Sequence, residues 1–306
     1  MATTPGDLTL YTEPTTGLAP VYGLITSAQR TVDLTMYELV DQTTEDDLAA
    51  DAARGVTVRV ILDHQREGSR NRAAYQYLSA HGVHVVWADP SYDATHQKTL
   101  TVDGDTSAIM TLNLVTEDYP DTRDFAVFDT NPADVEAIEQ TFRADFAHEP
   151  ITPPTGTDLV WSPTNALPSI LAVVDGASRT LAVENEEMGD RAVTTALEAA
   201  AKRGVDVTVA MTAAPEWDRA FAELTASGVH LAIHPDNSSS LYIHAKAIVA
   251  DVGTPAARAF AGSENFSVAS LGHNRELGLV TADTAVVTGL AGTLRSDLVV
   301  DDHDNH

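Results

Sequence analysis

The 306-residue sequence contains no cysteine and only three lysines, Lys98, Lys202 and Lys246. The absence of cysteine excludes disulfide bonds, thiolate zinc sites and cysteine nucleophiles. Long apolar runs are also missing, and none approaches the roughly 18–20 residues that span a bilayer. Residues 1–7 have neither a basic start nor an apolar stretch, so we expect no signal peptide in this sequence. We favour a mature secreted protein, without a transmembrane segment, over a cytoplasmic one.

Positive charge is scarce along the whole chain. Its 45 acidic residues outweigh 18 lysines and arginines, which gives a formal net charge of −27. A surface this acidic repels polyanions, whereas nucleic-acid-binding proteins normally carry a basic footprint. The charge itself is best explained by solubility or a salty habitat, and it argues against nucleic acid as a partner.

An internal duplication is the strongest organisational signal. Residues 30–62 align without a gap to residues 179–211, and each copy has a strand-like run, a helical stretch ending at a glycine, and a second β-branched run. A further matching pair follows at residues 80–86 and 227–233. We therefore divide the chain into homologous halves, residues 1–150 and 158–300, followed by a polar tail, residues 301–306. Prolines and a glycine make the segment between the halves a linker.

The same pattern predicts the fold class. Short buried strands alternate with helical segments of 10–15 residues, which is typical of parallel crossover units in an α/β sandwich. We expect the last helix of the first half at residues 132–148, with Asn131 as its N-cap.

One motif occurs at equivalent places in the two halves. His96, Lys98 and Asp103 have the spacing H-x-K-x4-D, and residues 244, 246 and 251 repeat it as His244, Lys246 and Asp251. Each copy lies on a strand-like run, so its histidine and lysine point to the same face. One such pattern occurs by accident, but two in register with the duplication, holding two of the three lysines, do not.

Further polar residues follow both motifs in the same order. Asn113 and Asn265 come first, and Asp124 and Glu276 open later strand-like runs. Two histidines supply a nucleophile and a proton donor near neutral pH. Lysines and asparagines hold a phosphate and stabilise the charge that develops on it. The set therefore suits attack on a phosphodiester, with no metal or other cofactor expected.

With these motifs the sequence resembles the phospholipase D superfamily, whose hallmark is a pair of H-x-K-x4-D motifs, each followed by a small-residue turn ending in asparagine. The resemblance covers nearly the whole chain. It implies two αβα half-domains with mixed sheets, related by a pseudo-twofold axis, with the motifs meeting at their interface. It also implies a covalent phosphohistidine intermediate.

The resemblance assigns roles to the candidate residues. His96 is expected to be the nucleophile and His244 the general acid and then base, although the two roles can be reversed. Phosphate is expected to contact both lysines, both asparagines and Ser263. Glu276, with Asp124 as its weaker counterpart, is expected to orient a catalytic histidine. Asp103 and Asp251 complete the motifs in a structural role.

This sequence departs from the family pattern in two places. Met110 replaces the glycine of the first turn, and residues 251–258 lengthen the second hairpin. Other acids carry weaker signals. Glu38 and residues 184–187 stand at the ends of equivalent strands, where a carboxylate cluster is a candidate for binding Ca²⁺ or a choline-like head group, but we favour plain surface acids. We interpret residues 117–121 as a solvated loop. We expect the loops at residues 89–95 and 234–242 to form the entrance to the site.

Three functions remain open from the sequence. The first is a monomeric phospholipase D that acts on phospholipids or other small phosphodiesters, by hydrolysis or by transfer to an alcohol, with transient contact to a membrane surface. The second is a metal-independent nuclease of the same superfamily. The third is a catalytically silent lipid- or protein-binding member, which the intact histidines and lysines argue against.

Overall fold

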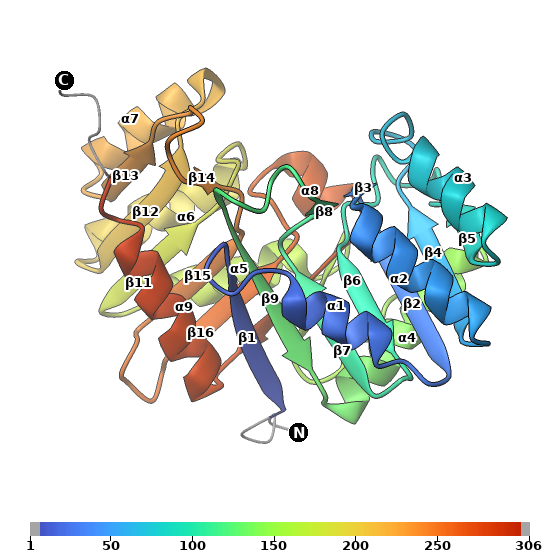
Figure 1. Cartoon of the computed structure of the whole chain (residues 1–306). Coiled ribbons are helices and arrows are strands. Elements are labelled where there is room, and N and C mark those ends of the chain that lie inside the picture. Colours follow the sequence, from blue (N-terminus) through green and yellow to red (C-terminus); the bar gives the residue numbers. More distant parts are fainter. Residues whose placement is uncertain (1–6, 301–306) are drawn as a thin grey trace.

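Two sheets with the same strand order make up most of the chain. The computed structural model describes residues 7–300, so the tail assigned to residues 301–306 lies outside the described part. Each strand of the first sheet has a counterpart at the same position in the second, which confirms the duplication and the two-half α/β fold. The two halves lie side by side in Figure 1, the first on the right and the second on the left.

Both sheets are mixed. In each sheet, three neighbouring strands at one edge run parallel, and the strands beyond them run antiparallel. In sheet order, the first contains β1 (Leu8–Glu13), β9 (Thr122–Asp129), β7 (Thr106–Met110), β6 (Thr99–Val102), β2 (Thr31–Met36), β4 (Thr57–Leu62) and β5 (His84–Trp87). The second contains β10 (Leu159–Ser162), β17 (Glu276–Thr281), β16 (Arg258–Gly262), β15 (Ala247–Ala250), β11 (Thr180–Glu184), β12 (Asp206–Thr212) and β13 (His230–His234).

Short elements complete the sheets. In the first half, β3 (Leu39–Val40) and β8 (Leu114–Val115) form a two-stranded parallel sheet. In addition, β14 (Tyr242–Ile243) of the second half pairs in parallel with β9 of the first. The β9–β14 pair is therefore a direct main-chain link between the halves.

The helices repeat as the strands do. The first half has α1 (Ala19–Thr26), α2 (Gln42–Ala53), α3 (Arg72–Ala80) and α4 (Pro132–Phe146). The second has α5 (Ala166–Gly176), α6 (Arg191–Lys202), the 3-10 turn η1 (Pro215–Trp217), α7 (Asp218–Ala226), α8 (Val268–Gly272) and α9 (Thr284–Ser296). Within residues 7–300, none of these helices has the length and apolar character needed to cross a bilayer.

Local sequence explains where the paired helices begin and end. Asp41 and Asp190 cap α2 and α6, because each side chain accepts a hydrogen bond from a backbone N–H of the first turn. Gly55 and Gly204 follow the helices with positive φ of 95° and 90°, a conformation that glycine adopts without strain. Asn131 caps α4 as expected, and that helix ends at Phe146, two residues earlier than predicted.

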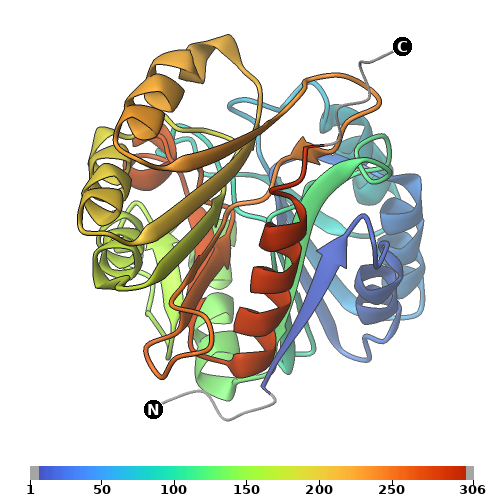
Figure 2. The same cartoon turned by 90° about the vertical axis from the view of Figure 1, so that its left-hand side faces the viewer.

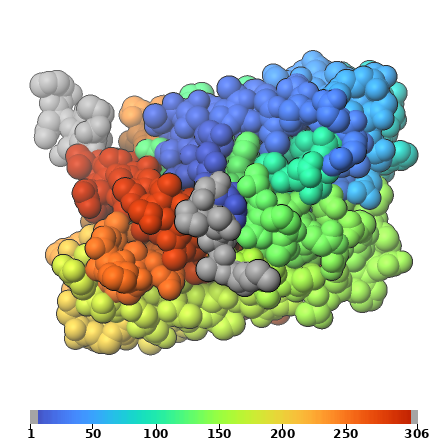
Figure 3. Space-filling model, turned by 90° about the horizontal axis from the view of Figure 1, so that it is seen from below, coloured from blue at the N-terminus to red at the C-terminus, as the bar shows by residue number. Residues whose placement is uncertain are grey.

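A shared apolar core joins the halves. It combines Phe125 and Val127 of β9 with Ala247 of β15 and Leu277 and Leu279 of β17, all fully or almost fully buried. The helix α9 also packs against β1, as Figure 2 shows, so the first strand and the last helix of the described residues are in contact. Figure 3 shows the same contact from below, where the red and dark blue segments adjoin. Groups at the interface are therefore held by packing from both sides.

Candidate active site

Each histidine of the paired motifs is anchored to the opposite half of the chain. The backbone N–H of His96 donates to the carbonyl of Arg275 at 3.0 Å, and the N–H of Ala245, next to His244, donates to the carbonyl of Arg123 at 2.9 Å. Both motifs therefore begin where the main chains of the two halves exchange hydrogen bonds. This exchange brings two segments about 150 residues apart in sequence to one place.

The imidazole rings are oriented across the same interface. His96 Nδ1 lies 2.8 Å from a carboxylate oxygen of Glu276 and 3.1 Å from the carbonyl oxygen of Ser263. His244 Nδ1 lies 2.9 Å from a carboxylate oxygen of Asp124. Since these carboxylate and carbonyl oxygens are acceptors, Nδ1 of each ring carries the proton. Nε2 is then the nitrogen available for chemistry in both rings.

The two lysines lie beneath the histidines and are almost completely buried. Lys98 is 1% exposed and donates to the carbonyl of His96 at 2.7 Å, and its ammonium lies 4.9 Å from the centre of the Tyr37 ring. Lys246 donates to the carbonyl of His244 and binds Glu186 at 3.0 Å. Burial, with the charge of Lys246 adding to it, lowers the pKa of Lys98 to about 7. Such a lysine gains its full charge when an anion binds beside it.

A cavity of about 620 Å³ opens above these groups. Its walls come largely from the segments next to β8 and β14, at the top centre of Figure 1. Both histidines and both asparagines line it, and Oδ1 of Asn113 and of Asn265 is buried without a hydrogen-bond partner among residues 7–300. The remaining lining residues are Tyr37, Glu38, Glu117, Asp118, Asp121, Thr122, Glu186, Glu187, Asp236, Asn237, Ser238, Ser240 and Tyr242.

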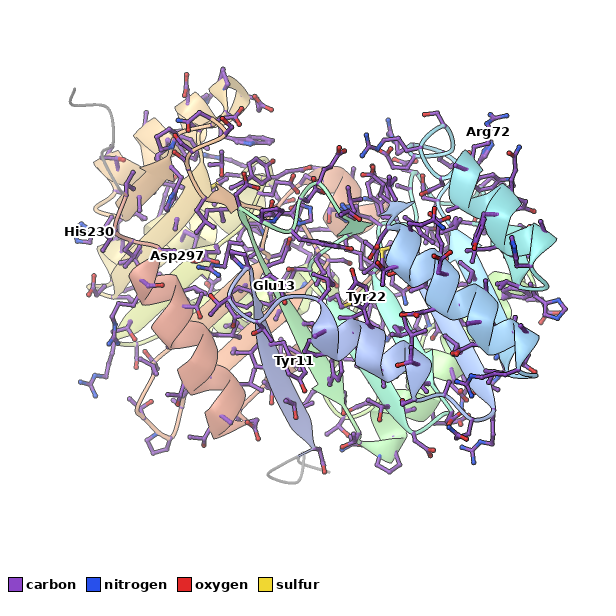
Figure 4. All side chains as sticks on the ribbon, in the orientation of Figure 1. Tyr11, Glu13, Tyr22, Arg72, His230 and Asp297 are labelled. Atoms are coloured by element: carbon purple, nitrogen blue, oxygen red, sulfur yellow. The ribbon has the colours of Figure 1, made fainter. Side chains whose placement is uncertain are left out.

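Two crossed ion pairs support the oriented histidines. Arg123 binds Asp297, which follows α9, through two contacts of 2.5 and 3.0 Å. The equivalent arginine of the second half, Arg275, binds Asp145 of α4 in the first half at 3.0 Å. Figure 4 labels Asp297 and Glu13, and the guanidinium of Arg123 bridges that aspartate to the Glu13 carbonyl.

No role was predicted for Arg123 and Arg275 from the sequence. The signal was nevertheless present, because an arginine precedes the orienting carboxylate at the same position in each half: Arg123 before Asp124 and Arg275 before Glu276. Each arginine and the acid that follows it therefore make two different contacts with the opposite half. The arginine fixes the other half's last helix, and the acid orients the other half's histidine.

This geometry agrees with a comparison to known families. The model of the family described as "Cardiolipin synthase, PLD-like domain" matches residues 21–146 and again residues 170–298. The chain belongs to this phospholipase D-like family. Its superfamily includes enzymes that act on phosphodiesters. Among curated protein sequences no significant match was found.

Solved structures give the same fold for this phospholipase D-like chain. The phosphatidylserine synthase of Haemophilus influenzae Rd KW20 superposes with a TM-score of 0.72 at 10% identity, covering 97% of this chain and 87% of that one. A polyphosphate kinase from Porphyromonas gingivalis superposes with a TM-score of 0.74 at 16% identity and covers 95% of this chain. This chain spans half the length of that kinase. At such identities the likeness shows the fold alone.

The two motif aspartates lie away from the cavity of the phospholipase D-like site. Asp103 accepts hydrogen bonds from three successive backbone N–H groups, at residues 29–31, and Asp251 does the same at residues 178–180. Both aspartates have positive φ, 56° and 52°, at the turn after their strands. They tie the end of one strand to the start of its neighbour, so they position the motif and do not contact the substrate cavity.

Ser263 departs from the expectation that it binds phosphate. Its hydroxyl is fully buried and accepts a hydrogen bond from the backbone N–H of Leu277 at 3.2 Å. Its carbonyl oxygen faces His96 Nδ1, so the residue helps to orient the histidine and is not among the groups that line the cavity.

The acids at the strand ends were wrongly interpreted as surface residues. Glu184 is fully buried, while Glu186, Glu187 and Glu38 line the cavity. Residues 117–121, expected to be a solvated loop, contribute three further acids to its wall. These side chains converge because equivalent strands of the two halves end at the same edge, which composition alone does not reveal.

Only one of the two loops expected at the entrance lines the cavity. Residues 234–242 line the cavity through Asp236, Asn237 and Tyr242, as expected. Residues 89–95 do not line it, because the end of this segment pairs with the opposite half through the bridge between Thr95 and Arg275. The wall assigned to them is formed by residues 117–122.

Proposed function

We propose that this protein is a phosphodiesterase of phospholipase D type, which cleaves the head-group phosphodiester of a phospholipid and passes the phosphatidyl group to water or an alcohol. The observation that carries the proposal is the convergence of two carboxylate-oriented histidines, from opposite halves, on one cavity with two buried lysines beneath them. Such an arrangement offers a nucleophile, a proton donor and two cations to a single phosphate.

The electrostatics favour His96 as the nucleophile. Burial lowers the pKa of His96, although the adjacent Glu276 opposes that effect, so its Nε2 is unprotonated near neutral pH. His244 lines the same cavity and its Nδ1 is held by Asp124, which leaves Nε2 to supply the acid in the first step.

The reaction follows from these roles of His96 and His244. Nε2 of His96 attacks phosphorus, the bond to the head-group oxygen breaks, and His244 gives its proton to that oxygen. Water or an alcohol then enters, gives a proton to His244, and its oxygen displaces His96 from phosphorus. The lysines and asparagines stabilise the charge on the non-bridging oxygens in both steps. Every proton taken in one step is returned in the other.

The chemistry around the cavity supports a small diester over a nucleic acid. Among the residues that the structure describes, no lysine or arginine lines the cavity, whereas seven carboxylates do. A polymer of phosphates would place its neighbouring charges against those acids. A lipid diester instead has one phosphate for the buried lysines, and we propose that the chain acts as a monomer in transient contact with a lipid surface.

A substrate panel in EDTA tests the proposal. Mixed micelles of phosphatidylcholine or phosphatidylglycerol, and plasmid DNA, are incubated with the wild-type protein and with the His96→Ala and His244→Ala variants. We expect continued release of a lipid head group by the wild type, no release by His96→Ala, and at most one equivalent per protein molecule from His244→Ala. Cleavage of DNA without cleavage of lipid would favour the nuclease, and inertness toward the whole panel would favour a silent binding module.

A further inference from the structure

The two halves of the site differ at one equivalent position. Tyr37 follows β2, and Glu186 occupies the matching place after β11. The Tyr37 ring contacts the His96 ring edge-on at 4.5 Å and lies over Lys98. Glu186 makes the corresponding contacts with His244 and Lys246, but it does so with a carboxylate. The duplication has therefore placed a neutral aromatic ring on one side of the site and an anion on the other.

The Glu186 carboxylate lies among donors expected to bind phosphate. Its Oε2 is 3.0 Å from Lys246 Nζ, 3.2 Å from Asn265 Nδ2 and 3.6 Å from His244 Nε2. Burial favours a neutral carboxyl, but Lys246 and His244 outweigh it and hold the pKa of Glu186 below its usual range. A bound phosphate must therefore share these donors with a second anion.

That sharing has an electrostatic cost that depends on the substrate. In the free protein Lys246 balances Glu186, but a phosphate drawing on the same ammonium leaves part of the carboxylate charge uncompensated. Two like charges at close range in a site of low dielectric repel strongly. A substrate that carries its own positive group beside the phosphate restores the balance. A neutral or anionic substrate does not.

The residues that line the cavity also favour a substrate with a positively charged group. Glu187 lies beside Glu186, and further acids line the mouth, while the rings of Tyr37 and Tyr242 add aromatic surface. Aromatic faces together with carboxylates are the surroundings that bind ammonium groups. Asn265 gives independent evidence for a ligand. This residue lines the cavity and is 4% exposed, and its Oδ1 has no hydrogen-bond partner in the described part of the chain.

We propose that Glu186 is a specificity-determining residue, which makes this site select phosphodiesters whose alcohol portion carries an ammonium group. The inference rests on the proposed phosphodiesterase function and names its substrate class. Glu186 does not take part in the bond changes. It raises the rate for a cationic substrate by compensating that charge while the phosphate occupies the lysines.

A pair of substrates that differ by one charge isolates this effect. Dihexanoyl phosphatidylcholine and its 3,3-dimethylbutyl ester, in which carbon replaces the quaternary nitrogen, have the same shape and are compared as monomers below their micelle-forming concentrations. We expect the wild type to prefer the choline ester in kcat/KM by roughly tenfold or more, since each 1.4 kcal/mol of charge compensation gives a factor of about ten.

Variants then assign the preference to one carboxylate. Glu186→Gln should bring the ratio close to one, through a loss on the choline ester with the rate on the neutral ester unchanged or raised. Glu186→Asp, which keeps the charge, should retain most of the preference. Glu149→Gln removes an exposed charge in the linker and should leave the wild-type ratio unchanged. Circular dichroism confirms that each variant is folded.

Several results would overturn the inference. Equal cleavage of the two esters by the wild type refutes cation selection without any variant. A Glu186→Gln protein that slows both esters by the same factor shows that the residue only holds Lys246 in place. Failure of the wild type to cleave either ester, or an equal rate in His96→Ala, refutes the underlying function instead, so the two failures are distinguishable.

Discussion

Glu276 belongs to the second half of the chain, but its carboxylate orients His96 of the first half through a 2.8 Å contact with Nδ1. Asp124 and His244 make the reverse contact. Neither half therefore contains a complete set of the proposed catalytic groups, because each supplies a histidine with its lysine and the acid that orients the other histidine. The duplicated fold forms one candidate active site from both halves.

Removing either orienting acid should lower activity without unfolding the protein. Glu276→Gln keeps the size of the side chain but removes the charge that fixes the tautomer and holds the ring, so we predict a fall in kcat of about 10²-fold or more. Asp124→Asn should have a similar effect on the other histidine. Steady-state kinetics measure the loss, and unchanged thermal unfolding serves as the control. Near-normal kcat in both variants would refute the orienting role.

The pH dependence of kcat/KM should be bell-shaped, with an alkaline limb near pH 7. Burial lowers the pKa of Lys98 to about 7, so its ammonium is present below that pH and is lost above it. Binding of the phosphate should weaken accordingly as the pH rises. The acid limb reflects protonation of His96, whose pKa burial places below the ordinary value.

Lys98→Arg separates the two limbs. A guanidinium remains charged throughout this range, so the part of the alkaline limb that comes from Lys98 should disappear from any residual activity while the acid limb stays. Substrate already bound raises the pKa of Lys98, so the effect belongs to kcat/KM more than to kcat. A wild-type kcat/KM that stays constant from pH 6 to pH 9 would disagree with this assignment.

Asp251 should matter for stability and not for chemistry. Burial opposes its ionisation, but hydrogen bonds from Ser178 and from the backbone of residues 178–180 outweigh burial and lower its pKa. The resulting stabilisation is present above the ordinary aspartate pKa of about 3.9 and is lost as the pH falls through the lower folded value.

Asp251→Asn tests this role with little backbone strain, since asparagine tolerates the positive φ of this position. We expect a loss of roughly 1–3 kcal/mol in the free energy of unfolding. Denaturant titration measures this loss, while kcat of the folded enzyme should remain unchanged. A stable variant with a collapsed kcat would instead give the aspartate a direct catalytic role.

The sequence predicted the repeat and its consequences well. The aligned segments at residues 30–62 and 179–211 became corresponding strands and helices, because glycine at the helix ends and β-branched runs are local signals that do not depend on the rest of the fold. The H-x-K spacing likewise placed His and Lys on one face of a strand. The convergence of both motifs on one cavity followed from the family resemblance.

The contacts across the interface could not be read from the sequence. The repeat shows that Asp124 and Glu276 are equivalent, but it does not show which histidine each one faces. Glu186 was misread for a similar reason. Acids at a strand end usually face solvent, whereas folding of the second half brings this one against Lys246 and Asn265, which are 60 and 79 residues away in sequence.

The most direct test of the shared site is to trap its covalent intermediate. The His244→Ala variant retains the nucleophile but lacks the group that activates water, so a single phosphatidyl adduct should accumulate on His96. Intact mass spectrometry after incubation with dihexanoyl phosphatidylcholine in EDTA, followed by peptide mapping, measures this directly, and His96→Ala should form no adduct. An adduct on any other residue, or turnover by the wild type with unchanged turnover in both variants, would contradict a single phosphate held between the two halves.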